Sequence, residues 1–287
     1  MQPVEEVGVI SKPNVTRARA VLPELMDWLR ERGIRARWDR ETAEYLGRGP
    51  GLPREAVPEG TQLVIVLGGD GTLLAAARAI AGREIPLFAV NLGGLGFLTA
   101  ITVEELYPEL ERALRGEHRI ARRHMLKCDL VRDDKTIAEY DALNDVVITK
   151  AALARMIDLE TRVDTQFVCT FKADGLIVST PTGSTAYSLS AGGPIMFPSV
   201  NALCITPICP HMLAYRPVLV PESSVIRIVV QAESEAAYLT IDGQTGQPLM
   251  RNDRIVCRSS PRALFLIRPP KAMFFDVLRA KLKWGER

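Results

Sequence analysis

Residues 63–80 read LVIVLGGDGTLLAAARAI, and this stretch decides the fold. Its first five residues are apolar, which predicts a short buried strand over Leu63–Leu67. Five residues with turn character follow, Gly68-Gly69-Asp70-Gly71-Thr72. Residues Leu73–Ile80 are rich in alanine and contain neither Gly nor Pro, which predicts a helix. The order of strand, glycine turn and helix is typical of a parallel sheet covered by helices.

The flanking segments continue this alternation. Val7–Ile10 is a short apolar run that predicts a strand, and the stretch after it carries apolar residues at helical spacing. Pro86–Asn91 predicts another buried strand. Residues Gly47–Gly60 are rich in Gly and Pro and therefore predict a surface loop. We expect an α/β nucleotide-binding domain over residues 1–100.

From about Glu117 the chain changes to short β-rich runs separated by turns. Their spacing is typical of a sandwich or barrel, and we expect a mainly-β domain, a β-sandwich, over residues 101–270. The stretch Ala272–Trp284 carries apolar residues on one helical face. It predicts a C-terminal helix within residues 271–287 that returns to the first domain. The expected fold class is therefore α/β plus mainly-β.

Composition excludes several classes of protein. The 287 residues are 47% hydrophobic and 24% charged, which is typical of a folded globular chain and not of a disordered one. The net charge of +2 is far from the strongly basic balance of proteins that bind nucleic acid nonspecifically, so we expect no nucleic-acid partner. The sequence lacks an apolar window long enough to span a membrane. We therefore expect a cytoplasmic protein that does not contact membranes.

Cysteine usage argues against both disulfides and a structural metal. The five cysteines are odd in number, widely scattered and without a Cys-x-x-Cys pair. Cys204, Cys209 and His211 lie close together but lack a plausible fourth ligand nearby, and structural zinc sites use four. We expect reduced cysteines and no structural zinc site, and none of these side chains is assigned as a metal ligand.

The glycine turn predicts an anion site. Backbone N–H groups and the positive end of a helix dipole meet where the strand passes into the helix, and glycine lets an anion approach the backbone closely. Asp70 would repel a phosphate there unless it holds a metal ion or accepts a proton from an attacking hydroxyl, and both roles belong to phosphoryl transfer. The alternative is a tight turn with Asp70 as the helix cap. Neither the Walker A loop nor the Gly-x-Gly-x-x-Gly fingerprint is present.

A second cluster spans Asp174–Pro194 and combines small hydroxylated residues and glycines with the single tyrosine Tyr187. Ser and Thr hydroxyls bind ribose or phosphate, and a tyrosine ring covers a base. The alternative is a flexible Ser/Gly linker, which the preceding apolar strand and the bulky Tyr187 and Leu189 disfavour.

Five motifs together resemble the NAD kinase family, of the bacterial type that uses ATP or polyphosphate. They cover almost the whole chain: Gly68–Thr72, Asn91–Leu98, Leu143–Val146, Asp174–Pro194 and Asp242–Gln244. The glycine turn alone is shared with lipid kinases and phosphofructokinases, whereas Pro181–Pro194 is highly specific. One departure is Met212–Pro217, where the family more usually has a Ser/Thr-Leu-Ser-x-Arg-Pro pattern.

The resemblance implies an enzyme that transfers the terminal phosphoryl group of ATP, or of polyphosphate, to the 2′-hydroxyl of the adenosine ribose of NAD, giving NADP. It implies a divalent cation such as Mg²⁺, and a homodimer or homotetramer. Asp70 is implied as the general base, with Gly71 beside it against the dinucleotide. Asn144 and Asp145 are implied to meet the adenine edge and the ribose hydroxyls, which predicts a partly exposed Asp145 carboxylate. The remaining implied nucleotide contacts are Arg155, Lys172, Asp174, Thr185, Ala186, Tyr187, Ser188, Leu189, Ser190 and Gln244.

Two rival functions stay open at this point. A lipid kinase shares the glycine turn but needs an apolar groove for acyl chains, whereas the second cluster here is rich in hydroxyls. A noncatalytic dinucleotide sensor would use the same pocket, but it has no need of Asp70 in the phosphate loop. Assays with NAD against diacylglycerol separate the first rival, and NAD binding without NADP formation would indicate the second.

Overall fold

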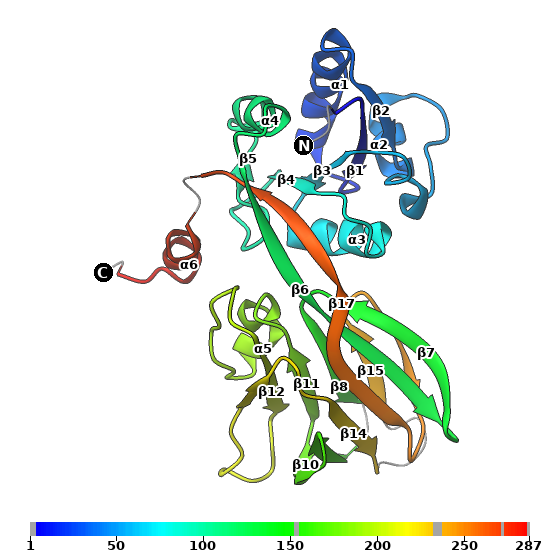
Figure 1. The fold of residues 1–287 in the computed structure, drawn as a ribbon, viewed down its shortest axis with the longest axis vertical. Helices are drawn as coiled ribbons and strands as arrows, with labels where there is room; N and C mark the ends of the chain where they lie inside the picture. Colours follow the sequence, from blue (N-terminus) through cyan, green and yellow to red (C-terminus); the bar gives the residue numbers. More distant parts are fainter. Residues whose placement is uncertain (1–3, 152–154, 232–236, 271–272, 286–287) are drawn as a thin grey trace. The chain divides into compact units, whose positions relative to one another are not determined.

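A computed structural model describes residues 4–151, 155–231, 237–270 and 273–285. The chain divides into two compact units (Figure 1). Unit 1 contains residues 1–122 and 264–287, and unit 2 contains residues 123–263. The first boundary thus lies at Arg122, some way beyond the expected one near residue 100. The C-terminal segment groups with unit 1.

Unit 1 is built on a parallel sheet. Its strands are β1 (Glu6–Ser11), β2 (Arg35–Trp38), β3 (Leu63–Gly68) and β4 (Leu87–Asn91), and their order is β4-β3-β1-β2. The short β5 (Ile101–Thr102) and the end of β17 (Arg254–Arg268) both pair with β4 in parallel. All residues of β3 and β4 are buried. Burial on both faces explains why these two strands are continuous apolar runs without alternation.

Helices cover both faces of this sheet (Figure 1). Helices α1 (Thr16–Glu31) and α4 (Leu106–Leu114) pack on the face that carries Val9, Ile65 and Phe88. Helix α3 (Asp70–Ile80) contacts β3 and β1 and buries six of its side chains. The α/β architecture predicted from the sequence is confirmed.

The elements of unit 1 that were not predicted include β2, β5 and α2 (Arg40–Leu46). The 3-10 turn η1 (Arg54–Ala56) lies inside the predicted loop 47–60. The last helix, α6, spans Phe274–Leu282, and its buried residues are Val277 and Leu278. None of the helices in the described ranges is long and apolar enough to cross a membrane.

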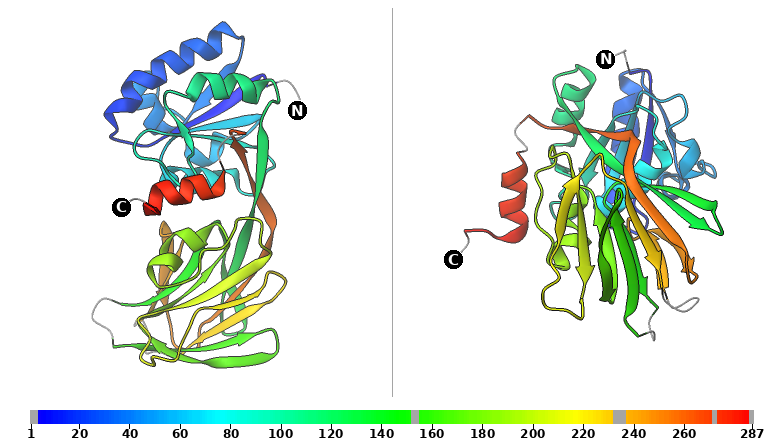
Figure 2. Two further views of the ribbon diagram at one scale, coloured as in Figure 1. Left: turned by 90° about the vertical axis from the view of Figure 1, so that its left-hand side faces the viewer. Right: turned by 60° about the horizontal axis from the view of Figure 1, so that its bottom comes forward.

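Unit 2 is a sandwich of two antiparallel sheets. One sheet has the order β13-β12-β11-β8-β15-β16, and these strands span Val218–Pro221, Ala202–Ile208, Gly175–Ser179, Asp145–Lys150, Ala237–Ile241 and Thr245–Leu249. The other has the order β10-β9-β14-β17-β6-β7, with β10 at Gln166–Ala173, β9 at Ile157–Val163, β14 at Ile226–Val230, β6 at Arg119–Arg132 and β7 at Lys135–Ala142. One apolar core contains residues from both sheets, and Figure 2 shows the two layers within the unit. The mainly-β second half is confirmed.

Candidate active site

The glycine turn lies at the carboxyl end of the parallel sheet in unit 1. Strand β3 ends at Gly68 and α3 begins at Asp70, with Gly69 as its N-cap. A Cβ atom at Gly68 would collide with the Thr72 side chain, so glycine is required there. A Cβ atom at Gly69 or Gly71 would meet no atom within 4 Å. These two glycines therefore border open space at the edge where parallel sheets bind ligands.

The Asp70 carboxylate is held by a segment that follows β4. Its Oδ1 accepts hydrogen bonds from the N–H groups of Leu98 (3.1 Å) and Thr99 (3.0 Å) and from the Thr99 hydroxyl (3.0 Å). Its Oδ2 accepts one, from the N–H of Phe97, at 2.9 Å. Successive N–H groups aimed at one anion fix its position. Asp70 is therefore oriented by the second motif of the sequence, and Oδ2 keeps spare capacity to accept a proton.

The opposite side of the same segment is held by an arginine. Arg268, on β17, is buried and donates to the carbonyl of Leu98 at 3.0 Å. Burial lowers the pKa of Arg268 below its usual value, and nearby Arg119 adds to this. A Cβ atom at Gly96 would collide with the Asp70 carboxylate. The position of Asp70 therefore depends on Gly96 and on Arg268, 198 residues further along the chain.

In unit 2, an aspartate turn organises the Asn144–Asp145 motif. Asp242 follows β15 with a φ of 51°, and its carboxylate accepts hydrogen bonds from the N–H groups of Leu143, Asn144 and Asp145 at 2.9, 2.7 and 3.1 Å. Strand register places Ile241 opposite Val146, so this turn and the start of β8 share one end of the sheet. Asp242 therefore fixes the backbone of the Asn144–Asp145 motif. Gln244, two residues after Asp242, lies at the same end of the sheet.

Asp145 does not have the exposure expected from the sequence. The residue is 3% exposed, so the expectation of a partly exposed carboxylate is wrong. Burial raises the pKa of Asp145 to about 7, and the nearby Asp242 adds to this rise. Asp145 therefore changes its charge near neutral pH, where a carboxyl group ordinarily stays ionised.

The hydroxyl-rich cluster is an ordered structure and not a flexible linker. The N–H of Thr180 donates to the carbonyl of Asn144 at 2.9 Å, and its hydroxyl donates to the carbonyl of Leu143 at 2.6 Å. A Cβ atom at Gly183 would collide with the backbone of Asn144. Since β11 ends at Ser179, opposite Asp145, the cluster begins at the same end of the sheet as the Asn144–Asp145 motif.

The predicted contacts in this cluster differ in accessibility. Tyr187 begins the short helix α5 (Tyr187–Ser190) and is 44% exposed. Thr185, Ala186 and Leu189 are half-buried and Ser190 is exposed. Ser188 is buried, and its hydroxyl pairs with that of Thr206 on β12 at 3.0 Å. The Ser188 side chain therefore stabilises the cluster, while the Tyr187 side chain is accessible to solvent.

Three predicted contacts lie in unit 2 away from the Asn144–Asp145 motif, and they do not share one sheet. Asp174 precedes β11 and pairs with Lys150, at the end of β8, at 2.8 Å. Lys172 lies on β10 and is exposed, and its carbonyl accepts the N–H of His211. Arg155 is exposed and precedes β9. Lys150, the partner of Asp174, lies five residues beyond Asp145 along β8, roughly 17 Å at the usual rise per residue. One copy of unit 2 therefore does not bring Lys172 and Asp174 beside Asn144.

Two basic residues near the glycine turn were missed from the sequence. Lys12 and Arg54 line a cavity of about 240 Å³ together with Gly69 and Gly71. Lys12 follows β1 directly, and its place at the carboxyl end of a predicted parallel strand was a usable signal. Arg54 lies in the Gly/Pro-rich segment, where nothing local marked it.

Comparison with known proteins assigns both units. The family model of the ATP-NAD kinase N-terminal domain matches residues 7–118, and that of the ATP-NAD kinase C-terminal domain matches residues 143–269. The chain is 66% identical over 284 residues to the NAD kinase of Solibacter usitatus, covering 99% of each chain. It is 49% identical over 285 residues to the NAD kinase of Koribacter versatilis, covering 99% of this chain and 100% of that one.

Solved structures agree with this assignment. The crystal structure of yeast NADH kinase complexed with NADH superposes with a TM-score of 0.92 at 27% identity, covering 100% of this chain and 90% of that one. The NAD kinase from Archaeoglobus fulgidus in complex with ATP gives a TM-score of 0.79 at 25% identity, covering 97% and 98%. The chain therefore belongs to the NAD kinase family, the kinases that phosphorylate NAD to NADP.

Proposed function

We propose that this enzyme transfers the terminal phosphoryl group of ATP, or of polyphosphate, to the 2′-hydroxyl of the adenosine ribose of NAD. One observation supports the binding of a dinucleotide. The side-chain oxygen of Asn144 is buried and accepts no hydrogen bond from any residue that the structure describes. A buried acceptor without a donor is costly, and the amino group of adenine supplies that donor. Asp145, next in the chain, then accepts the ribose hydroxyls.

Asp70 acts as the general base in this proposal. As the bond between the 2′-oxygen and the phosphorus forms, Oδ2 of Asp70 accepts the hydroxyl proton, and the bond from phosphorus to the leaving phosphate oxygen breaks. The donors from residues 97–99 support this role because they hold the carboxylate in one orientation before substrate binds. Gly71 beside it allows close approach of the substrate.

In this proposal the divalent cation binds together with the phosphates of the phosphoryl donor. The described ranges contain no group of three or more His, Cys, Asp or Glu side chains placed to hold a metal ion. Mg²⁺ usually keeps several waters and is bound through substrate phosphates with one or two carboxylates. We therefore propose Mg²⁺ as a companion of the donor phosphates and not as a resident of a protein cage.

The direct test is NADP formation by the purified protein with NAD, Mg²⁺ and either ATP or polyphosphate. NADP formation with either donor supports the proposal. NAD binding without NADP formation would identify a sensor, and phosphorylation of diacylglycerol in place of NAD would identify a lipid kinase. The cytoplasmic location stays a prediction from the sequence.

Replacing Tyr187 with Ala should raise KM for NAD about tenfold while kcat changes little. A ring that covers the dinucleotide contributes equally to the ground state and the transition state, so its loss affects binding. Steady-state kinetics with varied NAD measures this. Tyr238→Ala removes an equally exposed tyrosine, 42% exposed on β15, and serves as the control. A collapsed kcat with unchanged KM would contradict the role of Tyr187.

We also propose a homodimer or homotetramer in which a second copy contributes Lys172 and Asp174. The support is that Asp174 pairs with Lys150 at the end of β8 far from Asp145, and that Lys172 lies two residues before Asp174 on a strand of the other sheet. Variants Asp70→Asn and Asp174→Ala should each be impaired alone, whereas a mixture reassembled from dissociated subunits should regain activity. Such complementation requires sites that combine residues of two copies. A mixture no more active than its two components would place each site within one copy.

A further inference from the structure

The cavity beside the glycine turn is lined by two basic side chains. Its seven lining residues are Lys12, Pro13, Arg54, Gly69, Gly71, Thr72 and Ala75. Two of them are cations and none is an acid. Asp70 is not among them, because its carboxylate is directed to residues 97–99. The cavity is therefore lined by the glycines of the turn but not by the Asp70 carboxylate.

Lys12 is free to bind a ligand. Register places Ser11 of β1 beside Leu67 of β3, so Lys12 lies next to the glycine turn. Its backbone is fixed, since its N–H donates to the carbonyl of Leu67 at 2.8 Å and its carbonyl accepts the Tyr45 hydroxyl at 2.8 Å. Its side chain forms no ion pair with any residue in the described ranges. A fixed backbone with an unpaired ammonium group suits recognition of an anion.

Arg54 is held in place by a buried aspartate. Asp39 is 0% exposed, and its Oδ2 accepts hydrogen bonds from Nε and Nη2 of Arg54 at 3.1 and 2.9 Å. Its Oδ1 caps helix α2 by accepting the N–H of Thr42 at 3.0 Å. Glu41 lies 3.1 Å from Nη2 of Arg54. The guanidinium is thus clamped along one edge.

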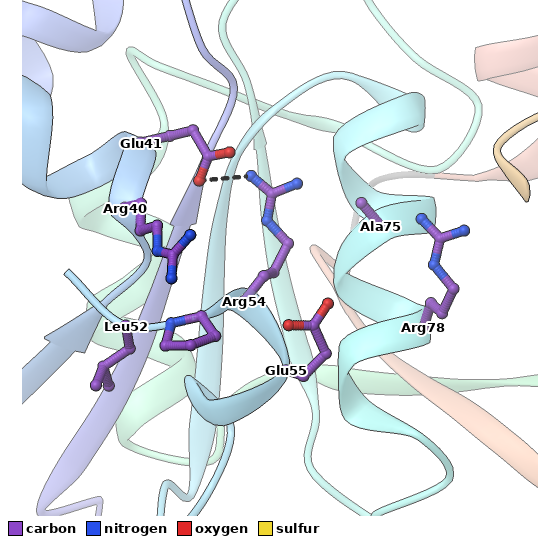
Figure 3. A pocket seen from close by; sticks show the side chains of 8 residues that line it. Arg40, Glu41, Leu52, Arg54, Glu55, Ala75 and Arg78 are labelled. Atoms are coloured by element: carbon purple, nitrogen blue, oxygen red, sulfur yellow. Dashed lines mark ion pairs between the residues drawn. The ribbon is translucent and has the colours of Figure 1, made fainter. Parts of the chain in front are cut away.

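The other edge of the guanidinium remains available. Nη1 of Arg54 makes no hydrogen bond to any described residue, and the side chain is 23% exposed. Figure 3 shows Arg54 between Glu41 of α2 and Ala75 of α3. Arg54 and Ala75 also line a neighbouring cavity of about 280 Å³, whose other charged residues are Arg40, Arg78, Glu41 and Glu55. Arg54 therefore presents preorganised donors where the two cavities adjoin.

We propose that Lys12 and Arg54 bind the phosphate chain of the phosphoryl donor in the cavity beside Gly69 and Gly71, and that Asp39 is the positioning residue for Arg54. The ligand class is a linear chain of phosphates, as in the triphosphate of ATP or in inorganic polyphosphate. The inference rests on the proposed function, since it assigns the donor of that reaction. Arginine forks and lysine ammonium groups are the usual protein partners of phosphate oxygens, and the N-terminus of α3 adds to the attraction.

The test uses the full-length protein with inorganic tripolyphosphate as the binding probe. Lys12→Ala and Arg54→Lys should each weaken tripolyphosphate binding in calorimetry by about tenfold or more, the usual effect of losing a hydrogen bond to a charged group. Both should raise KM for ATP and for polyphosphate by similar factors while KM for NAD stays unchanged. Arg54→Lys keeps a cation beside Asp39. If this variant does not fold, Lys12→Ala alone tests whether the cavity binds tripolyphosphate.

Two further variants complete the design. Arg48→Ala removes an exposed arginine of unit 1 that lines neither cavity and should leave tripolyphosphate binding unchanged. Asp39→Asn retains an N-cap but not the charge that holds Arg54. It should weaken tripolyphosphate binding in the wild-type background and have no further effect in the Arg54→Lys background. An equal effect in both backgrounds would mean that Asp39 does not act through Arg54 and contributes only to folding.

The outcomes separate this proposal from the proposed function. If the wild type forms NADP but Lys12→Ala and folded Arg54→Lys keep normal tripolyphosphate affinity and KM for ATP, the cavity is not the donor site and the kinase assignment is unaffected. If the wild type forms no NADP yet binds tripolyphosphate through Lys12 and Arg54, the phosphate site is supported and the proposed reaction fails.

Discussion

Asp70→Asn should lower kcat by roughly 10² to 10⁴, the usual contribution of a positioned general base. The substitution keeps the size of the side chain but removes its ability to accept the proton of the 2′-hydroxyl. The affinity for NAD, measured by calorimetry, should change little, because the proposed function assigns recognition of the dinucleotide to Asn144, Asp145 and Tyr187. Single-turnover rates at saturating NAD measure the effect on the chemical step.

The structure predicts that Asp70→Asn also lowers folding stability, which the sequence of the turn alone does not reveal. If the amide oxygen of the introduced asparagine takes the place of Oδ1 of Asp70, its NH₂ group faces the N–H of Phe97, which in the wild type donates to Oδ2. Two donors then oppose each other, and one hydrogen bond is lost. We expect about 1–3 kcal/mol of destabilisation, visible as a lower Tm.

Thr99→Val is the matched control for this disturbance. It removes one hydroxyl donor to Asp70 and leaves the amide of Asn91, 2.8 Å away, without that partner. The variant should lose folding stability but retain turnover within about tenfold, since the carboxylate is intact. Recovery of Asp70→Asn by excess Mg²⁺ would instead assign Asp70 to metal binding, because mass action overcomes a weakened site. Near-normal turnover of Asp70→Asn at ordinary Mg²⁺ would contradict both roles.

The sequence revealed those parts of the site whose signal is local. The Gly68–Thr72 turn was predictable because the strand, the turn and the helix lie within one continuous stretch. The partners of Asp70 were not, since they are backbone N–H groups 27 to 29 residues further on, and any residue type except proline carries such a group. The structural roles of Arg268 and Asp242 were missed for a related reason. Each acts on the backbone of a distant segment, so residue type alone gives no indication of the pairing.

The error at Asp145 has a physical cause. A carboxylate expected to serve a ligand predicts exposure, but Asp145 begins a central strand and lies between β11 and β15. The Asp242 turn folds onto residues 143–145 and encloses the motif. Arg54 lies in a segment that its composition predicts as an exposed loop. Its side chain is nevertheless held by an ion pair with the buried Asp39. In both cases tertiary packing determines the environment, and composition does not report it.

Asp145→Asn should make the protein more stable at pH 8. Between pH 4 and pH 7 the unfolded chain has released the Asp145 proton while the folded protein retains it, because burial raises the pKa to about 7. The free energy of unfolding therefore falls as pH rises through this window and levels off above it. The full effect is on the order of 4 kcal/mol. Asn lacks the titration, so its advantage should vanish near pH 4 and be complete by pH 8.

Urea unfolding of both proteins from pH 4 to pH 8 measures this difference. Asp134→Asn removes a carboxylate that is 88% exposed and controls for the change in net charge. The same titration should appear in binding, since a charged carboxylate accepts ribose hydroxyls more strongly than a neutral carboxyl. NAD affinity of the wild type should therefore increase as pH rises through 7, and Asp145→Asn should bind NAD about tenfold more weakly at pH 8 with no such step. Parallel stability curves for wild type and Asp145→Asn would mean that Asp145 is ionised in the folded protein, and a retained step in NAD affinity would assign that titration to another group.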